Sequence, residues 1–252
     1  MRTFGLCFLL LLTLATETLA EPLRIAVASN FKPALEQLLP AFSANHPDTK
    51  ITLSAGASGQ LFTQVSQGAP FDLFLSADAV YPSKLHAQGL AFAPLPYANG
   101  RLLLLSRTPA SQWQGAVQNA ARVALANPTL APYGAAAKSL LEGAGLWRQP
   151  NLKAPVLASN IAQVQQWFDT GNVDVAFAAA ALFKPDDSTQ VFDLTALLEH
   201  PIEQHLVILK RSRLQASATE FCDYLRSQPV QQQLKQLGYS PIATPNREAA
   251  DI

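Results

Sequence analysis

The sequence lacks an apolar run long enough to span a membrane, which takes about 20 residues. Its N-terminal apolar run, residues 4–14, follows Arg2 and precedes a stretch of small residues that ends at Ala20. This order is typical of a secretory signal peptide. We therefore expect residues 1–20 to be removed on export and the mature chain to be a soluble protein of the periplasm.

Cysteine and charge are both scarce. One of the two cysteines, Cys7, falls in the predicted signal peptide, so Cys222 has no partner for an internal disulfide and is expected to be a buried apolar residue. Charged residues make up 14% of the chain, the formal net charge is zero, and no basic run occurs. A nucleic-acid or anionic membrane surface is therefore not expected. Any bound anion must be held by something other than net charge.

Histidines are few and scattered. None of the four lies at helical spacing from a second histidine or beside a cysteine, as metal ligands do. The sequence therefore predicts no cofactor and no metal cation bound directly by side chains.

What the sequence does contain is an alternation of strands and helices, which predicts an α/β fold with largely parallel sheets. Apolar runs predict strands at 23–28, 50–54, 71–76, 101–106, 122–126, 173–178 and 205–210. Helical spacing follows most of them, and two helices are predicted at 216–227 and 229–237. Two irregular stretches, 91–100 and 184–200, suggest that the chain leaves a first lobe and returns to it. We expect the first lobe to comprise residues 21–104 and 205–252, and the second lobe residues 105–204.

Four predicted strand-to-helix junctions carry small hydroxyl, amide or tight-turn residues: Ser29-Asn30, Ser58-Gly59, Tyr133-Gly134 and Ser159-Asn160-Ile161. The first N–H groups of a helix have no partner within the helix, and the helix dipole adds partial positive charge there. Such an end binds anions readily, although serine and asparagine are also ordinary capping residues. Several helix ends directed at one point would hold a dianion without lysine or arginine.

Three segments carry a specific resemblance: AVASNFKPALEQLLPAF, SAGASGQLFTQVSQGAPFDLFLSAD and ALANPTLAPYGAAAKSLLEGAGL. They resemble the periplasmic molybdate-binding components of ABC transporters, and the resemblance covers essentially the whole mature chain. It implies a two-lobed periplasmic binding protein fold of type II, with two mixed sheets flanked by helices and a hinged cleft between the lobes. It also implies a monomer that binds molybdate or tungstate and passes it to a membrane permease and its ATPase.

The resemblance also implies which residues bind the oxyanion. Ser29 and Ser58 match hydroxyl donors of the first lobe, and Asn30 matches a contact made by backbone or side chain. Tyr133 and Ile161 match backbone N–H donors of the second lobe. Many relatives place a tyrosine where this sequence has Ala179, so its donor set is expected to resemble that of a subgroup without this tyrosine.

Two alternatives remain open at this level. A pocket made only of donors favours a fully ionised anion over hydrogen phosphate, but sulfate satisfies that condition as well as molybdate does. Ser29 and Lys32 form an S-x-x-K match to serine hydrolases of the penicillin-recognising class, although the S-D-N and K-T-G elements are absent. Asp72 and Asp78 are expected to be structural, because carboxylates beside a dianion would repel it.

Overall fold

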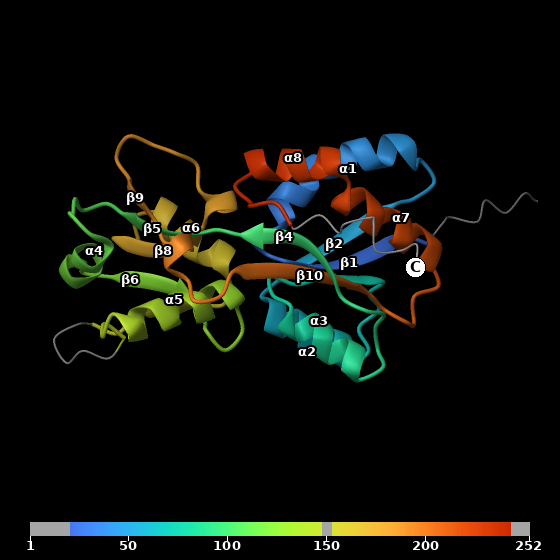
Figure 1. Ribbon diagram of the computed structural model, residues 1–252, viewed down its shortest axis with the longest axis horizontal. Coiled ribbons are helices and arrows are strands. Elements are labelled where there is room, and N and C mark those ends of the chain that lie inside the picture. The colour runs from blue at the N-terminus through green and yellow to red at the C-terminus, as the bar shows by residue number, and fades with distance from the viewer. Residues whose placement is uncertain (1–20, 148–152, 243–252) are drawn as a thin grey trace, which may run out of the picture.

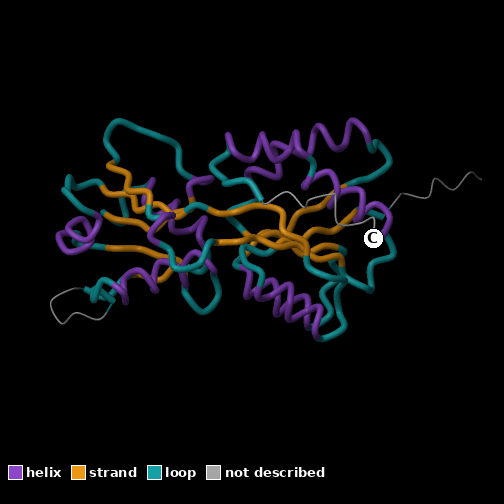
Figure 2. The backbone as a smooth tube through the Cα atoms, in the orientation of Figure 1, coloured by secondary structure: helices purple, strands orange, loops and turns teal. Residues whose placement is uncertain are grey.

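A computed structural model describes residues 21–147 and 153–242. The predicted signal peptide lies outside the described residues. Two five-stranded mixed sheets lie one after the other along the long axis, each in its own lobe (Figure 1). Strands form the middle of each lobe and helices cover them (Figure 2). This arrangement confirms the predicted α/β two-lobed fold.

The first lobe has the strand order β2-β1-β3-β10-β4. β1 pairs in parallel with β2 and β3, and β10 runs antiparallel to β3 and β4. These strands are β1 (Leu23–Ala28), β2 (Ile51–Gly56), β3 (Leu73–Leu75), β4 (Leu95–Gly100) and β10 (Ile202–Ile208). On one face lie α1 (Lys32–Asn45), α7 (Gln215–Arg226) and α8 (Gln228–Gln236), and on the other lie α2 (Ser58–Ser66) and α3 (Val80–Ala87) (Figure 1). Because helices cover both faces, β1 and β3 are almost continuously apolar and buried.

The second lobe has the strand order β7-β6-β8-β5-β9. β6 pairs in parallel with β7 and β8, and β5 runs antiparallel to β8 and β9. The strands are β5 (Leu102–Ser106), β6 (Val123–Ala126), β7 (Val156–Ala158), β8 (Val175–Ala179) and β9 (Gln190–Asp193). The helices are α4 (Trp113–Asn119), α5 (Pro132–Gly143) and α6 (Ile161–Asp169), with 3-10 turns η1 (Ala180–Leu182) and η2 (Thr195–Leu197). No described helix has the length and hydrophobicity needed to cross a bilayer.

The chain changes sheet twice, between β4 and β5 at Arg101 and between η2 and β10 at residues 198–201. The boundaries expected after residues 104 and 204 fall inside β5 and β10, a few residues beyond these crossings. We therefore propose lobe limits at the crossings themselves.

Three strands and two helices were not predicted. β4 and β9 lie within the stretches interpreted as irregular, and β7, α3 and α4 were overlooked. All three strands lie at the edge of a sheet. Edge strands are short and tolerate residues such as Pro96 of β4, because one side of the strand makes no ladder bonds. β4 and β9 mix apolar residues with polar residues or proline, and β7 is apolar but only 3 residues long, so none has the longer apolar run on which the strand predictions rest.

Candidate anion-binding site

The five residues predicted to bind the oxyanion line one pocket between the lobes: Ser29, Asn30, Ser58, Tyr133 and Ile161. It lies where the strand ends of both sheets lead into α1, α2, α5 and α6. Its volume is about 10 Å³, on the order of the space that one water-sized group needs. A solute as large as an amino acid or a sugar does not fit in this pocket as the lobes stand.

Four backbone N–H groups of this pocket are free to donate. Those of Asn30, Ser58, Tyr133 and Ile161 find no backbone acceptor among the described residues. The N–H of Ser29, by contrast, donates to the Gly56 carbonyl at 2.9 Å. Each free group lies at or just before the first turn of a helix, where N–H groups lack partners and the dipole favours negative charge.

Two serine hydroxyls add to these donors. Ser58 Oγ accepts a hydrogen bond of 3.0 Å from the Ala77 N–H, so its own proton remains to be donated. Ser58 is buried and Ser29 is 8% exposed. With the four N–H groups, the pocket offers six donors, drawn from both lobes.

The side chains of Asn30 and Tyr133 are engaged elsewhere. Asn30 Nδ2 donates to Gln204 Oε1 at 3.0 Å, and Tyr133 Oη accepts from Gln204 Nε2 at 3.3 Å. Burial raises the pKa of Tyr133, so the phenol stays neutral. These two residues therefore offer the pocket their backbone N–H groups. For Asn30, the sequence left open whether the backbone or the side chain makes the contact, and the engaged side chain favours the backbone.

Local structure fixes the two second-lobe N–H groups. Asn160 caps α6, its Oδ1 accepting the Gln163 N–H at 3.1 Å, and this holds the turn that presents Ile161. α5 begins so close to β6 that a Cβ on Gly134 would lie 2.7 Å from the carbonyl carbon of Ala126. Only glycine permits this approach of the helix to the strand.

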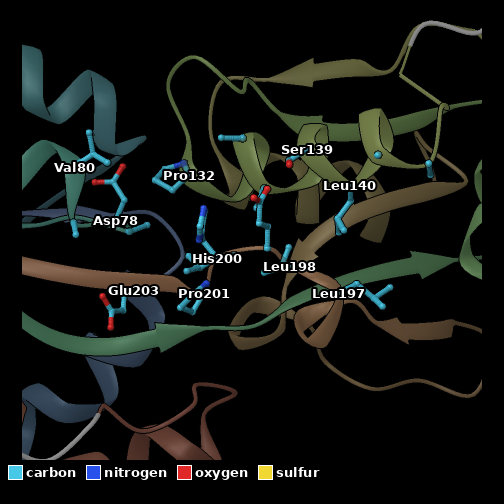
Figure 3. A pocket seen from close by; sticks show the side chains of 18 of the residues that line it. Asp78, Val80, Pro132, Ser139, Leu140, Leu197, Leu198, His200, Pro201 and Glu203 are labelled. Carbon is cyan, nitrogen blue, oxygen red and sulfur yellow. The ribbon is translucent and has the colours of Figure 1, made fainter.

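Among the residues that the structure describes, no charged side chain lines the pocket. A second hollow, with a volume of about 900 Å³, adjoins it at Ala77 and Pro132, which line both. Figure 3 shows Pro132 and His200 near its centre, with Asp78 and Glu203 to one side. This hollow is too wide to surround a small ion, and its carboxylates would repel an anion. The small pocket is therefore the candidate site.

The two lobes touch beside the pocket. Gly59 at the start of α2 donates its N–H to the Leu130 carbonyl at 2.8 Å. The Tyr81 hydroxyl donates to the Thr129 carbonyl at 3.3 Å. These contacts hold the first-lobe helices against the segment that precedes α5, so the structure shows the lobes together.

The geometry gives no support to the serine hydrolase alternative. Lys32 Nζ is paired with Glu36 Oε1 at 2.6 Å on the exposed side of α1, and it makes no hydrogen bond with Ser29. No group of three or more potential metal-ligating side chains occurs among the residues that the structure describes.

Asp72 and Asp78, which were interpreted as structural from the sequence, both accept hydrogen bonds within the first lobe. Asp72 accepts hydrogen bonds from the Arg24 N–H and the Ser212 hydroxyl, at 2.8 and 2.7 Å. Asp78 Oδ1 accepts from the Ser76 hydroxyl and the Tyr81 N–H, and so caps the loop that leads into α3.

Of two further features of the site, the first, the alanine at position 179, was noted from the sequence, and the second, Gln204, had no signal in it. Ala179 is buried and does not line the pocket, so no group replaces the missing tyrosine from that position. Gln204 lies on β10, far from the predicted junctions, yet it contacts both Asn30 and Tyr133.

Two α/β lobes that enclose a small ligand between helix ends define a class, the solute-binding proteins of bacterial transport. The chain belongs to the bacterial extracellular solute-binding protein family, whose model matches residues 23–240.

Within this family the chain is similar to molybdate-binding proteins. It is 33% identical to the molybdate-binding protein ModA of Rhodobacter capsulatus over 246 residues, 95% of this chain and 96% of that protein. It is 34% identical to ModA of Azotobacter vinelandii over 235 residues, 90% and 92% of the two chains. The solved structure of the Azotobacter vinelandii periplasmic molybdate-binding protein superposes with a TM-score of 0.79 at 31% identity, covering 88% of this chain and all of that one. The sulfate-binding protein SubI of Mycobacterium tuberculosis, at 17% identity and a TM-score of 0.72, shares the fold.

Proposed function

We propose that this chain captures molybdate, or tungstate, in the periplasm and delivers it to the permease and ATPase of an ABC importer. One observation carries the proposal: four free helix-end N–H groups and two serine hydroxyls, from both lobes, surround one pocket without a charged side chain. The similarity to molybdate-binding proteins of Rhodobacter and Azotobacter supports this choice of anion.

The ligand set is Ser29, Asn30, Ser58, Tyr133 and Ile161. Neutral donors bind an anion well because hydrogen bonds to a charged group are roughly twice as strong as those between neutral groups. The anion must be fully ionised, since a protonated oxygen would meet a donor and lose about 1–3 kcal/mol for the unmade bond. Hydrogen phosphate is therefore disfavoured, and sulfate is the competing candidate.

Ligand capture is expected to involve a hinge motion of the two lobes. The donors of the first lobe bind one side of the ion, and the N–H groups of Tyr133 and Ile161 are added when the second lobe closes. A monomer is sufficient for this, because both lobes belong to one chain, and the closed form is the one that the permease would accept.

Isothermal titration of mature protein with molybdate, tungstate, sulfate and phosphate tests the proposal. Ser29→Ala and Ser58→Ala should each weaken molybdate binding about 10- to 100-fold, the equivalent of one hydrogen bond to a charged group at about 1.5–3 kcal/mol. Ser43→Ala, on the exposed side of α1, is the matched control and should bind as the parent does. Preferential binding of sulfate would reassign the ligand, and absence of binding by all four anions would overturn the proposal.

A further inference from the structure

Gln204 makes hydrogen bonds to both lobes from a fully buried position. Its Oε1 accepts from Asn30 Nδ2 and from the Tyr97 hydroxyl, each at 3.0 Å. Its Nε2 donates to the Tyr133 hydroxyl at 3.3 Å. One side chain therefore joins the turn after β1 to the first turn of α5, and both of these present backbone N–H groups to the anion pocket.

The backbone directs Gln204 into this place. It lies on β10 just after the chain returns to the first lobe, and the register of β10 against β4 shifts between Gln204 and His205. Such a bulge re-aims the side chains next to it. Gly100, at the end of β4, leaves room for the contact, since a Cβ there would lie 2.9 Å from Gln204 Nε2 and 2.8 Å from Tyr133 Cζ.

Two buried tyrosines, Tyr97 and Tyr133, contact this glutamine, and a third, Tyr239, contacts its partner Asn30. Burial raises the pKa of Tyr97, Tyr133 and Tyr239, so each hydroxyl stays protonated. The Tyr239 hydroxyl donates to the Asn30 carbonyl at 2.8 Å, which holds the turn by its backbone while Gln204 holds its side chain. Because its Oε1 accepts from Asn30 Nδ2, the amide of Gln204 directs its N–H toward Tyr133.

We propose that Gln204 is a positioning residue that couples the anion-binding turn of the first lobe to the anion-binding helix of the second, and so sets affinity through lobe closure. The inference rests on the proposed function. Gln204 does not line the pocket, and it acts through the N–H groups of Asn30 and Tyr133. The bond to Tyr133 joins two lobes and forms only when they meet, whereas the bonds to Asn30 and Tyr97 lie within the first lobe.

The test is a double-mutant cycle of Gln204→Met and Tyr133→Phe, with molybdate affinity and dissociation rate measured by titration and stopped-flow tryptophan fluorescence. Each variant should raise the dissociation rate about tenfold, equivalent to about 1.4 kcal/mol, and the double variant should be no worse than Gln204→Met. Tyr133→Phe should leave the melting temperature of the ligand-free protein unchanged, because its lost bond joins the lobes. Gln165→Met, a buried glutamine on α6 bonded to Asp169, is the matched control and should keep the parental rate.

The outcomes separate the two proposals. If the parent binds molybdate and both variants dissociate at the parental rate, or if their effects add, the coupling by Gln204 is refuted while the proposed function stands. If the parent binds none of molybdate, tungstate and sulfate, the proposed function fails and this inference with it. Should Gln204→Met fail to fold, the dissociation rate of Tyr133→Phe decides alone, since that variant loses only one hydroxyl.

Discussion

Gly100 lies where the chain leaves the first lobe, and we predict that Gly100→Ala blocks closure over the anion. The added Cβ would collide with the Tyr133 hydroxyl and lie 2.8 Å from Cζ of the same ring. Gly100 does not have a positive φ, so its backbone conformation suits alanine. The Cβ would also lie 2.9 Å from Gln204 Nε2, at the far end of a first-lobe side chain that can shift. Tyr133 belongs to the second lobe, so opening of the lobes removes the collision with its ring, which is the larger of the two conflicts.

The size of the effect follows from the donors that closure supplies. A protein that cannot close loses the N–H groups of Tyr133 and Ile161, two of the six donors. At about 1.5–3 kcal/mol for each hydrogen bond to a charged group, the loss is about 3–6 kcal/mol, or roughly 10²- to 10⁴-fold in affinity. The melting temperature of the ligand-free protein should change little, because opening removes the collision with Tyr133 and only the end of the Gln204 side chain must shift.

Titration calorimetry with molybdate measures the affinity, and small-angle scattering with and without the ion reports closure. Gly115→Ala is the control, since a Cβ at that helical position would be 3.9 Å from its nearest neighbour. Tyr133→Phe added to Gly100→Ala removes the colliding hydroxyl and should restore part of the affinity. Affinity of Gly100→Ala within about threefold of the parent would refute the reasoning, because it would show that Tyr133 moves aside freely.

Three further predictions concern stability and reactivity. Burial raises the pKa of Asp78, so the folded state favours the protonated carboxyl and the stability of the protein falls as pH rises through that pKa. Asp78→Asn should therefore raise the melting temperature at neutral pH but not below pH 3.8. A lower melting temperature of the variant at neutral pH would contradict this. Cys222 is 1% exposed, and burial raises its pKa to about 12, so a thiol reagent should modify it only after unfolding; rapid labelling of the native protein would show the assignment to be wrong. Asn160→Ala removes the cap of α6, which should lower the free energy of unfolding in urea by about 1 kcal/mol and weaken molybdate binding. Unchanged molybdate affinity would show that the cap does not contribute to the site.

The fold class could be predicted because its strongest strands are buried on both faces. Runs such as LRIAVA in β1 are apolar except for Arg24, and the helices that follow have clear amphipathic spacing. The edge strands β4, β7 and β9 could not be predicted in the same way, since β4 and β9 carry mixed sequences and β7 is only 3 residues long. The expected lobe boundaries fall a few residues beyond the crossings between the sheets, because nothing in the apolar runs of β5 and β10 records which sheet they join.

The residues of the candidate site were accessible to sequence reasoning because they lie at junctions that chemistry and resemblance both mark. The structure brings Ser29, Ser58 and Ile161 to one pocket with the backbone of Asn30 and Tyr133. Gln204 was inaccessible, because a glutamine within a strand carries no signal and its partners are 174 and 71 residues away. Which N–H groups remain free also depends on backbone geometry that sequence patterns do not record.

The measurement that tests the central claim most directly is a crystal structure of the mature protein with molybdate, in which anomalous scattering locates the molybdenum. We predict a single peak between the two lobes, with the four oxygens accepting hydrogen bonds from the Ser29 and Ser58 hydroxyls and from the N–H groups of Asn30, Ser58, Tyr133 and Ile161. A peak in the acidic hollow beside Asp78 and Glu203, or an ion held by a lysine or arginine side chain, would contradict the account.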